Sequence, residues 1–235
     1  NLALESFRED KIIEKIKNSK VVNADETGLR IDGENCWLWV FAGDKEARYT
    51  TSESRGKGVA QDVLGKDFQG VVVSDFYSAY NQFGYKGKCW VHLLRKAREL
   101  TQQNPIKQRI KIKKLLNSVY QRIISFRGIE NTTEKERDKK AETIKEELQR
   151  IGKTKTVDHN LQVFLNRISK YSGELVVCVK NFAVPPDNNK AERAIRPAVV
   201  MRKISGGPRS KKGAHTFEVN LSVIETLKKE KENLF

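Results

Sequence analysis

The stretch Gly70-Val71-Val72-Val73-Ser74-Asp75 is an uninterrupted apolar run that ends on a carboxylate. Runs of this kind are typical of strands that are buried on both faces in parallel pairing. A helix is predicted shortly before it, over about residues 59–64, so the run is reached by a crossover connection. The stretch therefore indicates an α/β fold, in which helices cover a sheet.

Three more strands are predicted upstream of this run. Val21 to Asp25 is a short strand that also ends on a carboxylate, and Cys36 to Ala42 is rich in aromatic and β-branched residues. Gly43-Asp44-Lys45 has the composition of a hairpin turn and leads to a strand near Ala47 to Thr51. With a short strand over 87–90, these segments predict a mixed five-stranded sheet, after an opening polar helix over residues 1–20.

The hydrophobic period changes from two to 3.6 between Pro105 and Lys170, which predicts a set of amphipathic helices. The segment 173–182 fits either a strand or a short buried helix. After Pro185-Pro186, Asp187 or Asn188 can cap a helix that carries Glu192.

Pro197 is expected to kink or end that helix. A basic glycine loop over residues 202–212 and a last helix over about 217–229 follow. The predicted organisation is a sheet core in two parts, residues 1–104 and 184–235, with a mainly helical insertion over 105–183.

Composition restricts the class of partner. Lys and Arg outnumber Asp and Glu by 45 to 30, a formal net charge of +15, which predicts attraction to a polyanion such as nucleic acid. No apolar run of about eighteen residues is present, and no strongly amphipathic helix favours a membrane surface. The three cysteines are odd in number and scattered, which indicates reduced thiols and a cytoplasmic protein.

Three acidic residues have the pattern of a metal site. Asp25 and Asp75 end two separate hydrophobic strands, and Glu192 lies on a late helix. Mg²⁺ prefers carboxylate oxygens, and two ions held by such groups can stabilise the attacking and leaving oxygens of a phosphodiester displacement. The residue types alone leave a second interpretation open, in which these acids cap loops or face solvent.

Five ordered blocks carry a resemblance to the transposases of the insertion sequence 66 family, and it covers nearly the whole chain. They are Asp25-Glu26-Thr27, Trp37-Leu38-Trp39-Val40, Ser74-Asp75-Phe76-Tyr77-Ser78-Ala79-Tyr80-Asn81, Cys89-Trp90-Val91-His92-Leu93-Leu94-Arg95 and Asp187-Asn188-Asn189-Lys190-Ala191-Glu192-Arg193-Ala194-Ile195-Arg196-Pro197. Ser222-Val223-Ile224-Glu225-Thr226 near the end also fits.

The resemblance implies an RNase H-like core of the DDE type with a helical insertion before the glutamate. It implies catalysis with two Mg²⁺ or Mn²⁺ ions held by Asp25, Asp75 and Glu192. The implied reaction is hydrolytic nicking at transposon ends, followed by transfer of the 3′-hydroxyl into target DNA. The implied partners are double-stranded DNA and a second copy of the chain, in the nucleoid of a prokaryotic cell.

Neighbouring residues suggest auxiliary roles. Glu26 is expected to point to the opposite face of the strand from Asp25, so it is not the preferred ligand. Cys89 and His92 have zinc-like spacing, but a structural zinc needs four ligands and no second pair is nearby in sequence. His92 is instead predicted to lie beside the active site, where it contacts a phosphate or assists proton transfer; a packing role is the alternative.

Basic residues near Glu192 are candidate contacts to the DNA backbone. Arg is suited to bidentate phosphate contacts, and solvated surface arginines are the alternative interpretation. The candidates are Arg95, Arg193, Arg196, Lys203, Arg209 and Lys211. Two other functions remain open: an RNase H-like nuclease or resolvase without strand transfer, and a domesticated relic that binds DNA without cutting it.

Overall fold

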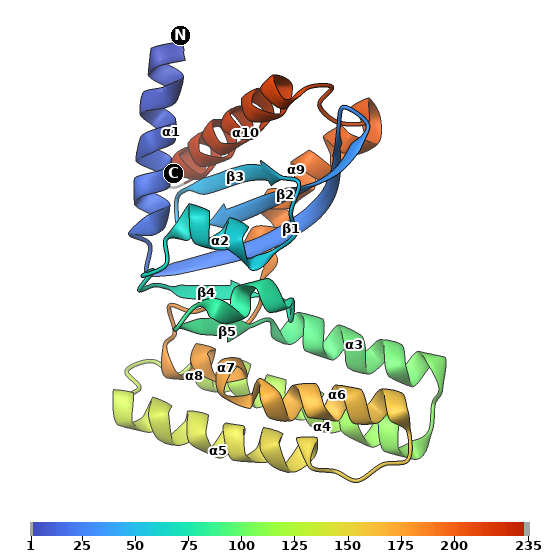
Figure 1. Cartoon of the computed structure of the whole chain (residues 1–235). Coiled ribbons are helices and arrows are strands. Elements are labelled where there is room, and N and C mark those ends of the chain that lie inside the picture. The colour runs from blue at the N-terminus through green and yellow to red at the C-terminus, as the bar shows by residue number, and fades with distance from the viewer. Residues whose placement is uncertain (1, 233–235) are drawn as a thin grey trace. The chain divides into compact units, whose positions relative to one another are not determined.

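The computed structural model describes the backbone of residues 2–232 and the side chains of residues 9–230. The chain forms two compact units (Figure 1). One, here called the sheet unit, contains the residues up to Lys86 and those from Asn188 onward. The other, the helical unit, spans Gly87–Asp187.

The sheet has five strands in the order β3-β2-β1-β4-β5. The strands are β1 (Val21–Ile31), β2 (Glu34–Ala42), β3 (Ala47–Ser52), β4 (Val71–Ser74) and β5 (Lys86–Lys88). The first three form an antiparallel meander, and β4 pairs with β1 in parallel. The predicted α/β fold, a mixed five-stranded sheet flanked by helices, is confirmed, and it is consistent with an RNase H-like fold.

The first strand is longer than predicted, because it does not end at Asp25. Its antiparallel pairing with β2 continues from Asn23, opposite Ala42, to Ile31, opposite Glu34. The turn lies at Asp32 and Gly33, whose φ values of 52° and 81° suit a two-residue hairpin. Asp25 therefore lies in the middle of a strand, where its backbone pairs with Val40 of β2.

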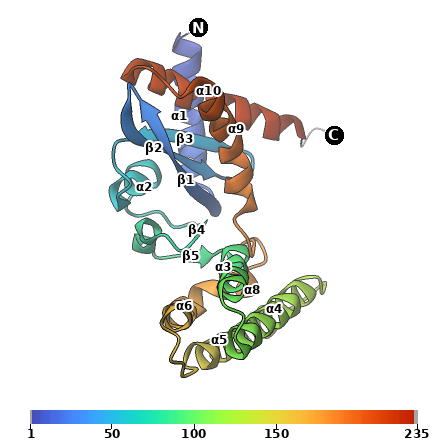
Figure 2. The same ribbon diagram turned by 90° about the vertical axis from the view of Figure 1, so that its right-hand side faces the viewer.

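Helices cover both faces of the sheet (Figure 2). On one face, α9 (Asn189–Ser205) and α10 (Lys211–Glu232) pack on a core that includes Leu29, Leu38 and Val40. On the other, α1 (Leu2–Lys17) and α2 (Lys57–Leu64) pack on a core that includes Val22, Trp39 and Phe41. The opening helix is thus confirmed, apart from Asn1, which lies outside the described residues.

The structure revises two predictions for the C-terminal part. Of the two effects predicted for Pro197, a kink or an end of the helix, the structure excludes the end, because the buried face of α9 continues past the proline from Ala194 to Ala198. The last helix begins at Lys211, so the predicted basic loop is reduced to residues 206–210. Gly206 ends α9 in the left-handed conformation, with φ of 78°, as glycines after helices commonly do.

The helical unit contains the amphipathic helices that periodicity predicted. Leu116, Leu148 and Leu165 are among its fully buried side chains. The segment 173–182, which left two interpretations open, forms two short helices. The helices are α3 (Trp90–Gln103), α4 (Lys107–Arg127), α5 (Glu134–Gly152), α6 (His159–Lys170), α7 (Ser172–Leu175) and α8 (Val177–Lys180). Because α3 packs against α4, this unit begins at Gly87 rather than near residue 105.

Candidate active site

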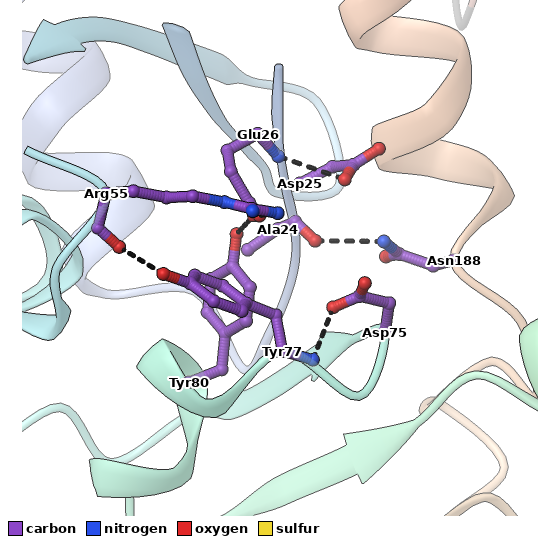
Figure 3. Close-up of polar contacts among 8 residues, drawn as sticks. All are labelled: Ala24, Asp25, Glu26, Arg55, Asp75, Tyr77, Tyr80 and Asn188. Carbon is purple, nitrogen blue, oxygen red and sulfur yellow. Dashed lines mark hydrogen bonds and ion pairs between the residues drawn. The ribbon is translucent and has the colours of Figure 1, made fainter. Parts of the chain in front are cut away.

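Asp25 lies within β1, and Asp75 directly follows the neighbouring strand β4. In the parallel register of β1 and β4, Asn23 lies opposite Val73, and each aspartate comes two residues later in its own segment. Figure 3 shows both side chains on the same side of β1 as Asn188. The sheet therefore brings together two carboxylates that are 50 positions apart in the sequence.

Glu192 reaches the same face from the first turn of α9. Side chains alternate along β1, and Asp25 shares its face with Leu29 and Ile31, which belong to the core beneath α9. Both Asp75 and Glu192 act electrostatically on Asp25 and raise its pKa. The charges of the three acidic residues predicted from the sequence thus interact within the sheet unit.

The carboxyl group of Asp25 has an unusual protonation behaviour. Burial raises its pKa to about 7, and the negative charges of Glu26, Asp75 and Glu192 contribute to the shift. A hydrogen bond from the backbone amide of Glu26 to Asp25 Oδ1, at 2.9 Å, acts in the opposite direction. Strong perturbation of this kind is common where charged groups are held together for function.

Asp75 is oriented by the segment that follows it. Its Oδ1 accepts a hydrogen bond from the backbone amide of Tyr77, at 2.8 Å (Figure 3). The Tyr77 hydroxyl donates to the carbonyl oxygen of Arg55, at 2.7 Å. The Arg55 guanidinium lies 4.3 Å from the ring centre of Trp37 and 4.2 Å from that of Tyr77. The Arg55 guanidinium, which packs against the rings of Trp37 and Tyr77, therefore helps to hold Tyr77, whose backbone amide orients Asp75.

Glu26 points to the opposite face of β1, as predicted. Its Oε1 accepts two hydrogen bonds from Arg55, and its Oε2 accepts one from the Tyr80 hydroxyl, at 2.6 Å (Figure 3). Burial and the charge of Glu26 hold the pKa of Tyr80 well above its usual value, so the phenol stays a donor. Glu26 is thus held by hydrogen bonds from Arg55 and Tyr80, on the opposite face of β1 from Asp25.

Sequence reasoning missed this network and also the role of Asn188. Asn188 is fully buried at the start of α9. Its Nδ2 donates to the carbonyl oxygen of Ala24, and its Oδ1 accepts from Asn23 Nδ2, both at 2.9 Å. The side chain therefore binds β1 instead of capping the helix. Tyr77, Tyr80 and Asn188 all lie within the sequence blocks that resemble the transposase family. That resemblance was the signal that could have pointed to them.

The basic candidates are distributed over both units. Arg193 and Arg196 are exposed on α9, and Lys203 is exposed in its last turn. Arg209 is exposed in the following loop, while Lys211 begins α10 and forms an ion pair with Glu53 at 2.9 Å.

The remaining candidates belong to the helical unit. The half-buried His92 and the exposed Arg95 lie on α3, and the buried Cys89 precedes that helix. The three cysteines of the chain are free thiols. Among the helices within residues 2–232, none is long and apolar enough to cross a membrane.

Comparison with known proteins identifies the family. A sequence model of the Transposase IS66 family matches residues 2–216. Two proteins of Sinorhizobium fredii (strain NBRC 101917 / NGR234), described as uncharacterized proteins y4jO and y4qI, are each 26% identical to the chain. The alignments cover 68% and 93% of this chain and 48% and 46% of those proteins, so the chain spans about half their length. No solved structure matches the chain at a significant level. The chain belongs to the IS66 family of transposases.

Proposed function

We propose that this chain is the catalytic domain of a DDE-type DNA transposase, in which Asp25, Asp75 and Glu192 hold two Mg²⁺ or Mn²⁺ ions. The observation that carries the proposal is the convergence of three carboxylates from the strand β1, from the residue that follows the neighbouring strand β4, and from the helix α9. Family membership supports a transposase function in general. The metal site and the individual reaction steps belong to the proposal.

The donor set fits hard divalent cations. All three residues offer carboxylate oxygens, which Mg²⁺ and Mn²⁺ prefer. Burial, and after it the negative charges of the neighbouring acids, raises the pKa of Asp25, and a bound cation would offset both effects. Two ions at such a site stabilise the attacking and leaving oxygens of an in-line displacement at phosphorus.

The proposed reaction has two displacements. In the first, a water oxygen bonds to phosphorus at the transposon end, and the 3′ oxygen leaves to give a free 3′-hydroxyl. In the second, that 3′-hydroxyl attacks a phosphodiester of the target DNA, and a target 3′ oxygen leaves. Asp25, Asp75 and Glu192 would hold the ions, which would supply the charge stabilisation of the reacting phosphodiester, and the exposed Arg193 and Arg196 on α9 are placed to contact phosphate oxygens.

The direct test is cleavage and joining of a labelled duplex that carries the terminal sequence of the element itself. Wild type is compared with Asp25→Asn, Asp75→Asn and Glu192→Gln in the presence of Mg²⁺, Mn²⁺ or EDTA. Asp67→Asn is the matched control, because Asp67 is an exposed carboxylate of the same unit. The proposal predicts metal-dependent nicking and joined product, both lost in the three site variants and retained in the control.

Other outcomes separate the alternatives. Metal-dependent nicking without joined product supports an RNase H-like nuclease or resolvase. Binding of DNA without cleavage by any metal supports a non-catalytic relic and contradicts the catalytic proposal. Because two transposon ends must be brought together, a homodimer is the proposed active assembly, which sedimentation of the DNA complex tests.

A further inference from the structure

The positive charge of the chain is concentrated in the helical unit. Residues 87–187 contain 22 Lys and Arg against 11 Asp and Glu, so this unit carries +11 of the formal net charge of +15. The sheet unit, which is longer and contains Asp25, Asp75 and Glu192, carries a formal net charge of only +4. The attraction to a polyanion that composition predicts is therefore located mainly on the helices.

Within the helical unit the charge is again uneven. Residues 88–127, which include α3 and α4, contain 11 basic residues and a single acidic one, Glu99. By contrast, α5 contains six basic and six acidic residues. A helix with balanced charges is typical of a solvated surface, whereas α3 and α4 present almost exclusively cations.

Some of these cations have structural roles, and others do not. Arg109 is buried in an ion pair with Asp158, and Arg122 pairs with Glu147. Arg127 donates to backbone carbonyl groups of residues 178, 182 and 184. Five others form no salt bridge with any residue in the described part of the chain: Arg98, Lys107, Lys111, Lys113 and Lys114.

These five residues line two hollows in the surface of the helical unit. A groove of about 370 Å³ between α3 and α4 is lined by Arg95, Arg98, Lys113 and Asn117, over the aliphatic side chains of Val91 and Leu94. A second hollow, along α4, is lined by Lys107, Lys111 and Lys114. We refer to Arg95, Arg98, Lys107, Lys111, Lys113 and Lys114 as the α3–α4 basic face.

The spacing along α4 suits a linear polyanion. Lys107, Lys111 and Lys114 follow one side of the helix, because positions i, i+4 and i+7 share a face. They extend over about 10 Å of helix axis, whereas duplex DNA carries one charge about every 1.7 Å of its own axis. Several phosphates of one duplex segment are thus within reach of this row of ammonium groups.

We propose that the α3–α4 basic face binds the sugar-phosphate backbone of duplex DNA without regard to sequence. The proposal rests on the proposed function, because a transposase must hold DNA as well as cut it. The lining residues are lysines, arginines, an asparagine, a serine and aliphatic residues, with no aromatic ring for stacking on unpaired bases. Long flexible lysines fit a positioning role on phosphates, which carries no sequence information.

The test measures binding of the full chain to a labelled duplex of arbitrary sequence, in EDTA, over a series of salt concentrations. The test variant is Lys107→Gln, Lys111→Gln and Lys114→Gln combined. The matched control is Lys135→Gln, Lys139→Gln and Lys153→Gln combined, which removes three exposed charges from the same unit, on α5 and just after it. Thermal unfolding of both variants shows whether they are folded.

The test variant is expected to bind at least about tenfold more weakly, and the slope of log affinity against log salt is expected to fall by about one per lysine. The control is expected to retain the wild-type slope. Equal losses in both variants would show that net charge alone is responsible and overturn the proposal. If the test variant lost binding to vesicles of anionic lipid but bound DNA as tightly as wild type, the face would be assigned to a membrane surface and the proposal would be overturned.

The outcome is independent of the catalytic proposal. In EDTA, Asp25→Asn is expected to bind the same duplex as tightly as wild type. If the site variants abolish nicking while the α3–α4 variant binds DNA as tightly as wild type, the proposed active site is supported and the proposed DNA-binding face is contradicted. The reverse pattern, weakened binding by the α3–α4 variant with no metal-dependent cleavage by wild type, supports the face and contradicts the active site.

Discussion

Arg55 donates two hydrogen bonds to a single carboxylate oxygen of Glu26, from Nε at 3.2 Å and from Nη2 at 2.8 Å (Figure 3). The Glu26 side chain is only 2% exposed, whereas that of Arg55 is 43% exposed. Arg55→Ala leaves a buried carboxylate without its cation. We expect the free energy of unfolding to fall by about 1–3 kcal/mol, measured by urea denaturation.

An exposed ion pair of the same unit provides the control. Lys211 and Glu53 are 92% and 75% exposed, so Lys211→Ala is expected to leave the free energy of unfolding almost unchanged. A loss for Arg55→Ala no larger than that for Lys211→Ala would show that the network around Glu26 does not stabilise the sheet unit.

Asn188 provides the second prediction, because it joins the start of α9 to β1 beside Asp25. Asn188→Ala removes the hydrogen bonds to Ala24 and Asn23 from a fully buried position. We expect a loss of about 2–3 kcal/mol in unfolding free energy, and weaker metal-dependent nicking because Glu192 follows on the same helix. Asn220→Ala, at an exposed position of α10, is the control. Equal stability of the two variants would contradict this role.

Lys229 gives a prediction about alkaline pH. Burial lowers its pKa to about 8, with a further contribution from Lys190, while its Nζ donates to the carbonyl oxygens of Gly43 and Glu46. Between about pH 8 and 10.4 the unfolded chain holds a proton that the folded chain has released. The stability of wild type relative to Lys229→Met should therefore rise with pH in this window, by at most about 1.4 kcal/mol per pH unit.

Denaturant titrations of both proteins at several pH values measure this difference. A constant difference from pH 8 to 10.4 would mean that Lys229 keeps its ordinary pKa in the folded protein. A difference that falls as pH rises would reverse the assigned sign and show that partners such as Glu46 outweigh burial.

Local patterns in the sequence predict much of the fold. Alternation along β1 separates Asp25 from Glu26, and the apolar run 70–75 predicts the parallel strand that carries Asp75 to its side. Helical periodicity likewise predicts α4, α5 and α6. These features depend on neighbours within a few residues, so they can be read without the tertiary structure.

Features that depend on distant partners could not be read in the same way. Thr27 and Gly28 are poor evidence for a strand by themselves, yet pairing with β2 extends β1 through them to Ile31. Arg55 lies 29 positions from Glu26, and Asn188 lies 164 positions from Ala24. The helix of Glu192 passes through Pro197 because the sheet stabilises its buried face on both sides of the proline.

The central claim is that Asp25, Asp75 and Glu192 form a metal site, and titration with Mn²⁺ followed by electron paramagnetic resonance tests it without DNA. The spectrum of free Mn²⁺ loses intensity as the ion binds, so stoichiometry and affinity are measured together. We predict that wild type and Asp67→Asn bind two ions alike, and that Asp25→Asn, Asp75→Asn and Glu192→Gln each lose at least one. Unchanged stoichiometry and affinity in all three folded site variants would contradict the claim.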